Sequence, residues 1–290
     1  LLNLKLEMNS RLSHNHSLHC NCFQSYDCAM STALCGNFLI ALCVTVSITN
    51  IINRPMINVI CVKWGTKYSS ADVNRLKKNV KKYLTVPHKF FCYTEDPVGL
   101  RCTAISIPPD NDLEIYWNKL AMFQKDFIEG TCLYFDIDVV IQNNIDNITD
   151  YLCDDLTMIR CYWKGDIVTD GSSPKFKERY DMYVNSSMLL WKGGSLSNIW
   201  EYFDDNADYY MVKYKGIDRF LFHEGFTLKY FPQGIAYSRI HGITENDYTV
   251  EMHLNTDHDF EFYYDPDALV CMFNGPTTDS MYEPFKHHWE

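Results

Sequence analysis

Short apolar runs alternate with helical patterns along most of the chain. From Met56 onward, apolar and β-branched residues form strand-length runs at 57–62, 88–93 and 102–107. Between the first two runs, Ser69 precedes a segment with apolar residues at helical spacing, which predicts a capped helix. Those apolar positions are Val73, Leu76, Val80 and Leu84. This order of strands and helices predicts an α/β fold with a mixed, mostly parallel sheet flanked by helices.

The second half of the chain continues the alternation. Helical patterns are expected over 116–128 and 199–211. Strand patterns fall at 133–141, 156–163, 183–191 and 269–273. No internal repeat and no low-complexity linker interrupts the chain after residue 56, so residues 56–290 are predicted to form one domain.

Residues 1–55 differ in character from the rest. No charged residue occurs between Asp27 and Arg54, and the apolar stretch at 29–52 is long enough to span a bilayer. One interpretation is a membrane anchor that uses this stretch. The other is a leader or disordered extension, with Met56 at the start of the folded domain. In both interpretations the segment is separate from the α/β domain.

The run at 133–141 carries two carboxylates, Asp136 and Asp138. Alternate residues of an extended strand point to the same face, so the two acids are expected to project together. Two like charges beside an apolar core repel each other and lose hydration, and a divalent cation between them offsets both effects. The spacing therefore indicates a metal site with positions left for phosphate oxygens. The alternative is a chance spacing in a chain with 37 acidic residues.

The amino-acid composition favours some classes of ligand and argues against others. The chain has 290 residues and is 47% hydrophobic, with 20 Tyr, 17 Phe and 6 Trp, which is typical of a globular protein. Clefts rich in Tyr and Trp suit sugars and nucleosides. The net charge of −11 argues against a general nucleic-acid binder, which needs a basic surface. An acidic protein that handles phosphorylated ligands needs a metal ion or a few placed cations.

The 12 cysteines indicate a reducing compartment. Seven of them follow residue 56 and sit within or beside apolar runs, as Cys61 and Cys92 do. This distribution is typical of buried free thiols, so a cytoplasmic location is expected, with membrane anchoring through 29–52 as the alternative. A His/Cys cluster between His14 and Cys22 lacks the paired spacing of zinc sites.

Taken in order, five short motifs resemble GT-A-fold glycosyltransferases of family 8 and their bacterial and phage-type relatives. The resemblance covers residues 56–278. The motifs are Val62-Lys63-Trp64-Gly65-Thr66-Lys67-Tyr68, Trp117-Asn118-Lys119-Leu120, Tyr134-Phe135-Asp136-Ile137-Asp138, Asn185-Ser186-Ser187-Met188 and Phe273-Asn274-Gly275. The resemblance implies a GT-A-like (Rossmann-like) α/β fold. It also implies transfer of a sugar from a nucleotide-sugar donor, expected to be a UDP-sugar, to an unknown acceptor with retention of configuration.

The same resemblance implies roles for individual residues. Asp136 and Asp138, with Asn274, are expected to bind Mn²⁺ or Mg²⁺, which stabilises a diphosphate leaving group as a Lewis acid. Asn185 and Asp218 are expected to act as catalytic residues beside the reacting sugar. The residues expected to contact the nucleotide-sugar are Val62, Lys63, Trp64, Gly65, Tyr68, Thr94, Lys119, Asp136, Ser186 and Gly275.

One departure from the family pattern keeps other interpretations open. The relatives carry His-Gly after the last strand and a basic residue soon after it, whereas this chain has Asn274 and no lysine before Lys286. An amide oxygen is a weaker metal ligand than imidazole, so a homologue that binds sugar or nucleotide without turnover is an alternative. A haloacid-dehalogenase-type phosphohydrolase, with Asp136 as nucleophile and Asp138 as general acid, is another.

Overall fold

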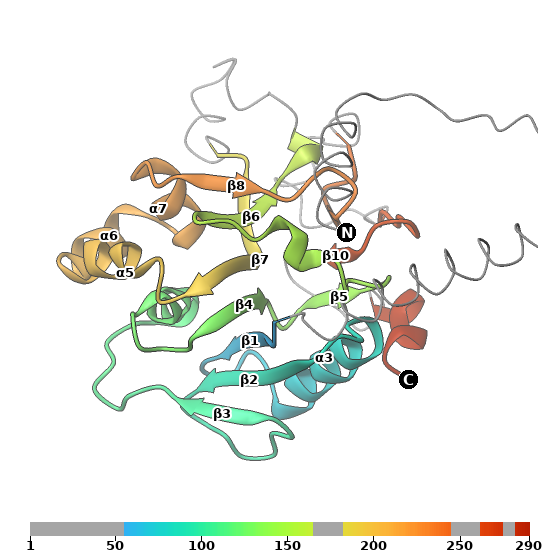
Figure 1. Cartoon of the computed structure of the whole chain (residues 1–290), viewed down its shortest axis with the longest axis horizontal. Helices are drawn as coiled ribbons and strands as arrows, with labels where there is room; N and C mark the ends of the chain where they lie inside the picture. Colours follow the sequence, from blue (N-terminus) through green and yellow to red (C-terminus); the bar gives the residue numbers. More distant parts are fainter. Residues whose placement is uncertain (1–54, 165–181, 245–261, 275–281) are drawn as a thin grey trace, which may run out of the picture. The chain divides into compact units, whose positions relative to one another are not determined.

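The computed structural model describes residues 55–164, 182–244, 262–274 and 282–290. A seven-stranded sheet runs in the order β3-β2-β1-β4-β7-β6-β8, and a three-stranded sheet in the order β5-β10-β9 (Figure 1). The strands are β1 (Ile57–Lys63), β2 (His88–Thr94), β3 (Thr103–Ser106), β4 (Gly130–Phe135), β5 (Val139–Ile141), β6 (Leu156–Arg160), β7 (Val184–Gly193), β8 (Leu228–Tyr230), β9 (Ala236–Ser238) and β10 (Val270–Met272). The α-helices are α3 (Ser70–Tyr83), α5 (Ser197–Asp204), α6 (Ala207–Lys213) and α7 (Ile217–His223). Short 3₁₀ helices are η1 (Ile115–Phe123), η2 (Ile148–Tyr151), η3 (Tyr162–Lys164) and η5 (Glu283–His288).

The larger sheet changes direction at β7. Strands β3, β2, β1 and β4 are parallel, whereas β7 is antiparallel to both β4 and β6. The register pairs Phe135, the last residue of β4, with Met188 in the middle of β7, so residues 184–187 extend past the end of β4. The first residues of β7 therefore lie at the same sheet edge as the carboxyl ends of the parallel strands. Ligands of open α/β sheets bind at such an edge.

Apolar side chains cover both faces of this sheet. On β1, Val59 and Cys61 belong to one buried cluster and Ile60 to another, because successive residues of a strand point to opposite faces. The first cluster includes the apolar face of α3, and the second includes side chains of η1, α5 and α7. Burial on both faces explains why β1 and β4 are near-continuous apolar runs.

Helix α3 forms where the sequence predicts it. Ser69 is the N-cap residue: its hydroxyl accepts a hydrogen bond from the Asp72 N–H, and the Asp72 side chain accepts one from the Ser69 N–H. This reciprocal pair is a capping box. Val73, Leu76 and Val80 are buried against the sheet, as their helical spacing predicts. The cap fixes the start of α3 directly after Tyr68.

The prediction of one continuous strand over 133–141 is wrong. Strand β4 ends at Phe135, and the Val139 N–H donates to the Asp136 carbonyl at 3.3 Å, which closes a turn. Strand β5 then pairs with β10 in the smaller sheet. The chain has to leave one sheet and enter the other between these strands. Asp136 and Asp138 therefore share a turn, and the alternation of a strand does not orient them.

Three other boundaries differ from the predictions. The helix expected over 116–128 is the 3₁₀ helix η1, which ends at Phe123. After it, the Gln124 N–H and the Phe127 N–H each donate a hydrogen bond to the carbonyl three residues earlier. The helix expected over 199–211 is divided into α5 and α6 at residues 205–206. Strand β6 ends at Arg160, ahead of η3, and does not continue to residue 163. Apolar periodicity alone did not reveal these breaks.

The described residues test the predictions on the N-terminal segment and on the cysteines to different extents. The N-terminal segment 1–55 lies outside them except for its last residue. Among the residues that are described, no helix has the length and apolar character needed to cross a membrane. The seven cysteines after residue 56 are free thiols, as predicted, and Cys61, Cys92, Cys132, Cys161 and Cys271 are buried.

We expect Ser69→Ala to lower the free energy of unfolding by about 1 kcal/mol, because it removes the acceptor for the Asp72 N–H. Urea denaturation followed by circular dichroism measures the change. Thr66→Ala, an exposed position outside the cap, is the control and should leave the midpoint unchanged. An equal loss in both variants would contradict the role of the cap.

Candidate functional site

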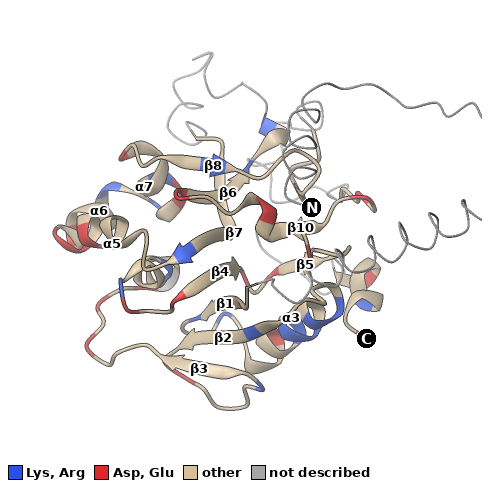
Figure 2. Cartoon of the chain, viewed as in Figure 1, with Lys and Arg blue, Asp and Glu red and all other residues tan. Residues whose placement is uncertain are grey.

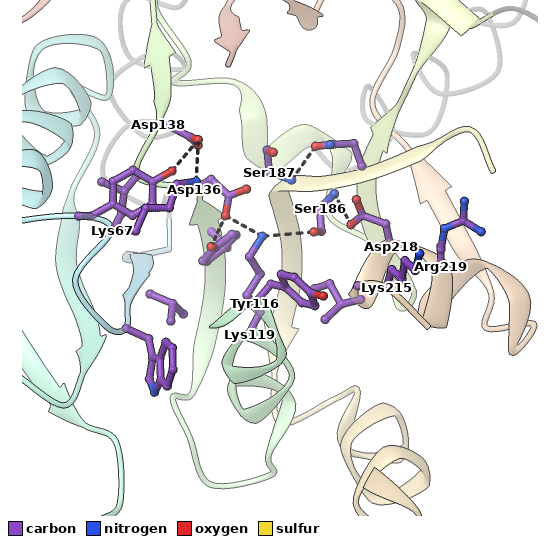
Figure 3. Close-up of a pocket in the computed structure, with 18 of the residues that line it drawn as sticks. Lys67, Tyr116, Lys119, Asp136, Asp138, Ser186, Ser187, Lys215, Asp218 and Arg219 are labelled. Atoms are coloured by element: carbon purple, nitrogen blue, oxygen red, sulfur yellow. Dashed lines mark hydrogen bonds and ion pairs between the residues drawn. The ribbon is translucent and has the colours of Figure 1, made fainter. Parts of the chain in front are cut away.

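A cavity of about 280 Å³ opens at the edge of the larger sheet where β1 and β4 end. Five segments line it: the end of β1 and the loop after it, η1, the turn after β4, the start of β7, and the start of α7. Figure 3 shows side chains from these segments pointing toward one another. Asp136 and Asp138 lie on one side of the cavity, and Asp218 with Arg219 lies on the other (Figure 3).

Asp136 is fixed by its backbone and its carboxylate together. Its N–H donates to the Ser187 carbonyl of β7 at 2.9 Å. Its Oδ1 accepts from Lys119 Nζ at 2.6 Å and from the Tyr134 hydroxyl. Lys119 also donates to Ser186 Oγ at 3.3 Å, so one buried ammonium group connects η1 to both β4 and β7. Charge-assisted bonds of this kind are stronger than neutral ones.

Asp138 is held mainly by Tyr68, whose hydroxyl donates to Oδ2 at 2.7 Å. Lys67 Nζ lies 4.0 Å from the same oxygen, and its own side chain is 64% exposed. Burial raises the pKa of Asp138, and the neighbouring Asp136 raises it further. The ionised form of Asp138 is therefore destabilised electrostatically in the folded protein, and an added cation would reduce this destabilisation.

The free oxygens of this pair suit a divalent ion. Among the described residues, Asp136 Oδ2 and Asp138 Oδ1 accept no hydrogen bond. The described residues contain no cluster of three or more His, Cys, Asp or Glu side chains arranged for a metal. Two carboxylates are nevertheless enough for Mg²⁺-type ions, which complete their shell with water and substrate phosphates. The donor set therefore fits a metal that substrate helps to hold.

Asn274, predicted as a third metal ligand, is half-buried and does not line the cavity. It lies two residues after Met272, and Met272 pairs with Val139, the residue that follows Asp138 in the sequence. The antiparallel register thus brings the end of β10 beside the turn that carries the two acids. Gly275 lies outside the described residues.

The opposite wall is built from β7 and α7. Asp218 Oδ1 accepts the Ser186 N–H at 2.9 Å, and Asn185 Oδ1 accepts the Ser187 N–H at 2.8 Å. Burial raises the pKa of Asp218, although Lys119 and the bond from Ser186 oppose this. Both predicted catalytic side chains are therefore fixed by backbone hydrogen bonds within the cavity wall.

The structure brings together most of the residues predicted from the sequence. The cavity is lined by Val62, Trp64, Tyr68, Lys119, Asp136, Asp138, Asn185, Ser186 and Asp218. Lys63, Gly65 and Thr94 do not line it. Lys63 pairs instead with Asp96 at 3.5 Å, the Gly65 N–H donates to Glu95 at 2.6 Å and the Thr94 hydroxyl donates to the Asp96 carbonyl at 3.2 Å.

Sequence reasoning missed three cations of the cavity: Lys67, Lys215 and Arg219. Lys67 lies within the motif at 62–68, but only other residues of that motif were predicted to contact the nucleotide-sugar. Lys215 and Arg219 flank the Gly216-Ile217-Asp218 segment. A glycine followed by an acid at the start of a helix was the sequence pattern that could have pointed to these two cations. Lys286, the first lysine after Asn274, pairs with Glu283 at 2.5 Å on η5 and lies away from the cavity.

No protein-family model matches the chain, and no curated protein matches it in sequence. Solved structures do match. The galactosyltransferase LgtC in complex with donor and acceptor sugar analogs has a TM-score of 0.50 and 14% identity, over 76% of this chain and 87% of that chain. An active-site mutant of LgtC gives the same TM-score and identity, over 76% of this chain and 88% of its own.

The glycosyltransferase GlyE of Streptococcus pneumoniae TIGR4 also has a TM-score of 0.50, at 13% identity, over 75% of this chain and 55% of its own. At such identities the likeness establishes the fold alone. The expected GT-A-like α/β fold, similar to that of family 8 glycosyltransferases, is confirmed.

We expect Asp138→Asn to stabilise the metal-free protein at neutral pH. Because the pKa of Asp138 is raised in the folded state, the unfolded chain loses this proton first as the pH rises above the ordinary value, and the resulting loss of stability is complete once the pH exceeds the folded-state pKa. Below the ordinary aspartate value of 3.8 the variant and the wild type should unfold alike, and the gap should open as the pH rises. Urea midpoints measured in chelator across this range give the result.

Asp126→Asn, at an exposed aspartate outside the cavity, serves as the control. A gain in Asp138→Asn that stays constant from acid to neutral pH would show that ionisation is not its cause.

Proposed function

We propose that the protein is a metal-dependent glycosyltransferase that moves a sugar from a UDP-sugar to an acceptor, with retention of configuration. The observation that carries the proposal is the pair Asp136 and Asp138. Each presents one carboxylate oxygen without a hydrogen bond among the described residues, beside a cavity at the carboxyl edge of a GT-A-like sheet. The acceptor is left open. Retention rests on the resemblance to family 8.

Asp136 and Asp138 would hold Mn²⁺ or Mg²⁺, with Asn274 as the candidate third ligand. When bound, the ion supplies Lewis-acid stabilisation of the charge that grows on a departing diphosphate. The protein's part is to present the two oxygens in fixed positions. Lys119, Tyr134 and Tyr68 do this by occupying the other carboxylate oxygens.

The cavity also contains cations that fit a diphosphate. Lys67 is the best placed, because its exposed ammonium group lies 4.0 Å from Asp138 and stacks over the Tyr68 ring at 4.6 Å. Its ammonium group would donate to a phosphate oxygen of a diphosphate bound in the cavity. In this chain Lys67 would take the role of the basic residue that the relatives carry after the last strand.

The remaining walls suit a nucleoside and a sugar. Val62, Trp64 and Tyr68 form an apolar and aromatic side at the end of β1, where a base and ribose can pack. Asn185, Ser186 and Asp218 form the polar side, which can hydrogen-bond sugar hydroxyls. Asp218 is aimed by the Ser186 N–H and is the carboxylate expected nearest the reacting sugar.

A homologue that binds a nucleotide-sugar without turnover is the second candidate. It is favoured by Asn274 in place of histidine, and by the Lys119–Asp136 ion pair at 2.6 Å, which already neutralises one of the two acids. The phosphohydrolase alternative receives no such support. In that class the Asp-x-Asp motif lies on the first strand, whereas here it follows β4.

Release of UDP from a panel of UDP-hexoses, with Mn²⁺ or with chelator, tests the proposal. We expect Mn²⁺-dependent release in the wild type. Asp138→Ala should lower it at least about 100-fold, since loss of an outer-shell partner alone costs about 10–100-fold. Asp126→Ala is the control. UDP that binds without any release would identify the non-catalytic homologue, and Mn²⁺-dependent release that survives in Asp138→Ala would refute the metal site.

We expect Lys67→Ala to raise the donor KM by about tenfold, because it removes one charge-assisted hydrogen bond to phosphate. The change in kcat should be smaller if Lys67 binds the diphosphate in both the ground state and the transition state. Steady-state kinetics against donor concentration separates the two parameters. Lys192→Ala removes an exposed lysine outside the cavity and should change neither.

A further inference from the structure

Positive charge gathers on one side of the domain, although the chain carries a net charge of −11. Figure 2 shows Lys and Arg along α3 and at the start of β2. We name the set the α3 basic face and define it by six residues. They are Lys77, Lys78, Lys81 and Lys82 on α3, Lys89 on β2 and Arg101 in the loop between β2 and β3.

These six side chains have no acidic partner in the part of the chain that the structure describes. Among the described residues none of them forms an ion pair, whereas Arg75 on the same helix pairs with Asp72 at 2.9 Å. Lys78, Lys81 and Lys89 are exposed. Several members also surround one shallow hollow, which Lys77, Lys81, Lys89 and Arg101 line together with His88. Like charges this close repel one another, and an external anion would relieve that repulsion.

An exposed apolar side chain lies in the loop that ends at Arg101 of this face. Val98, at the tip of the loop between β2 and β3, is 77% exposed. Asn74 ties the loop to α3, since it donates to the Gly99 carbonyl at 2.9 Å and accepts the Arg101 N–H at 2.8 Å. Lys77 donates to the Arg101 carbonyl as well. These hydrogen bonds fix the second half of the loop against α3, whereas its first half carries the exposed acids Glu95 and Asp96.

We propose that the α3 basic face docks the protein on an anionic lipid bilayer. Lysine and arginine side chains bind acidic headgroups through their charge, and an exposed apolar side chain enters the interfacial layer. Nucleic acid would satisfy the charge but offers nothing for Val98. This surface is distinct from the apolar segment at 29–52, and the proposal does not depend on sugar transfer.

The α3 basic face is close in sequence to the residues of the cavity, so docking on a bilayer would also orient the cavity. Helix α3 begins two residues after Tyr68, a residue of the cavity, and the loop that carries Val98 follows Asp96, the partner of Lys63 at the end of β1. The elements that would contact lipid are therefore adjacent in sequence to the loop at 64–68, which forms one wall of the cavity, although none of the six residues of the α3 basic face lines it. Binding to a bilayer would hold that wall at a fixed distance from the membrane surface.

Sedimentation of the full chain with vesicles tests the proposal. The probes are vesicles of phosphatidylcholine alone and of an equimolar mixture with phosphatidylglycerol. We expect tighter binding to the mixture. The triple variant Lys78→Gln/Lys81→Gln/Lys89→Gln should bind the mixture about 100-fold more weakly, at about fivefold per lysine. Its binding to pure phosphatidylcholine should be unchanged, because that bilayer has no net charge to attract the three lysines.

Lys125→Gln/Lys192→Gln/Lys229→Gln carries the same change in net charge at lysines outside the face and is the matched control. Both triple variants should unfold at the wild-type urea midpoint. Val98→Ser should weaken binding to the mixture without reducing its salt dependence. The proposal is overturned by equal loss in both triple variants, by wild-type affinity in the first triple variant, or by no preference for the anionic vesicles. It is also overturned if a duplex oligonucleotide binds the face more tightly than the vesicles do.

Discussion

Two carboxylates at the rim of an apolar core set the main constraint on this structure. Asp136 and Asp138 lie in the turn between β4 and β5, where burial raises the pKa of Asp138 and Asp136 adds to the rise. Lys119 and Tyr134 hold one carboxylate, and Tyr68 holds the other. Each partner comes from a different part of the fold, so the turn keeps its geometry only while the sheet, η1 and the loop after β1 are all in place.

The sheet supplies that arrangement through β7, the strand that runs antiparallel to both of its neighbours. Because β7 runs antiparallel to β4, its first residues meet the end of β4, and the Ser187 carbonyl receives the Asp136 N–H. Ser186 then reaches Asp218 on α7 through its N–H and Lys119 through its hydroxyl. A single pairing register thus connects the proposed metal-binding turn to the proposed sugar-binding wall. In the proposed reaction these fixed polar groups would need little reorganisation to meet a charged substrate, which is the main requirement for electrostatic catalysis.

The sequence predicted what local pattern determines. Strands β1 and β2 and the capped helix α3 are encoded by nearby residues, and the motif residues Trp64, Tyr68 and Asn185 do line one cavity. The turn at residues 136–138 escaped prediction because it depends on β5 pairing with β10, which is distant in the sequence. Lys215 and Arg219 were missed for a related reason: only the packing of α7 against β7 and η1 brings them to the cavity.

The central claim is that Asp136 and Asp138 form a metal-dependent site for a nucleotide diphosphate. Titration calorimetry of UDP into the full chain, with and without Mn²⁺, tests it most directly, with GDP and ADP as comparison ligands. UDP is expected to bind in the presence of Mn²⁺, and this binding is expected to disappear in Asp138→Ala. Absence of UDP binding under both conditions, or equal binding by the wild type and Asp138→Ala, would contradict it.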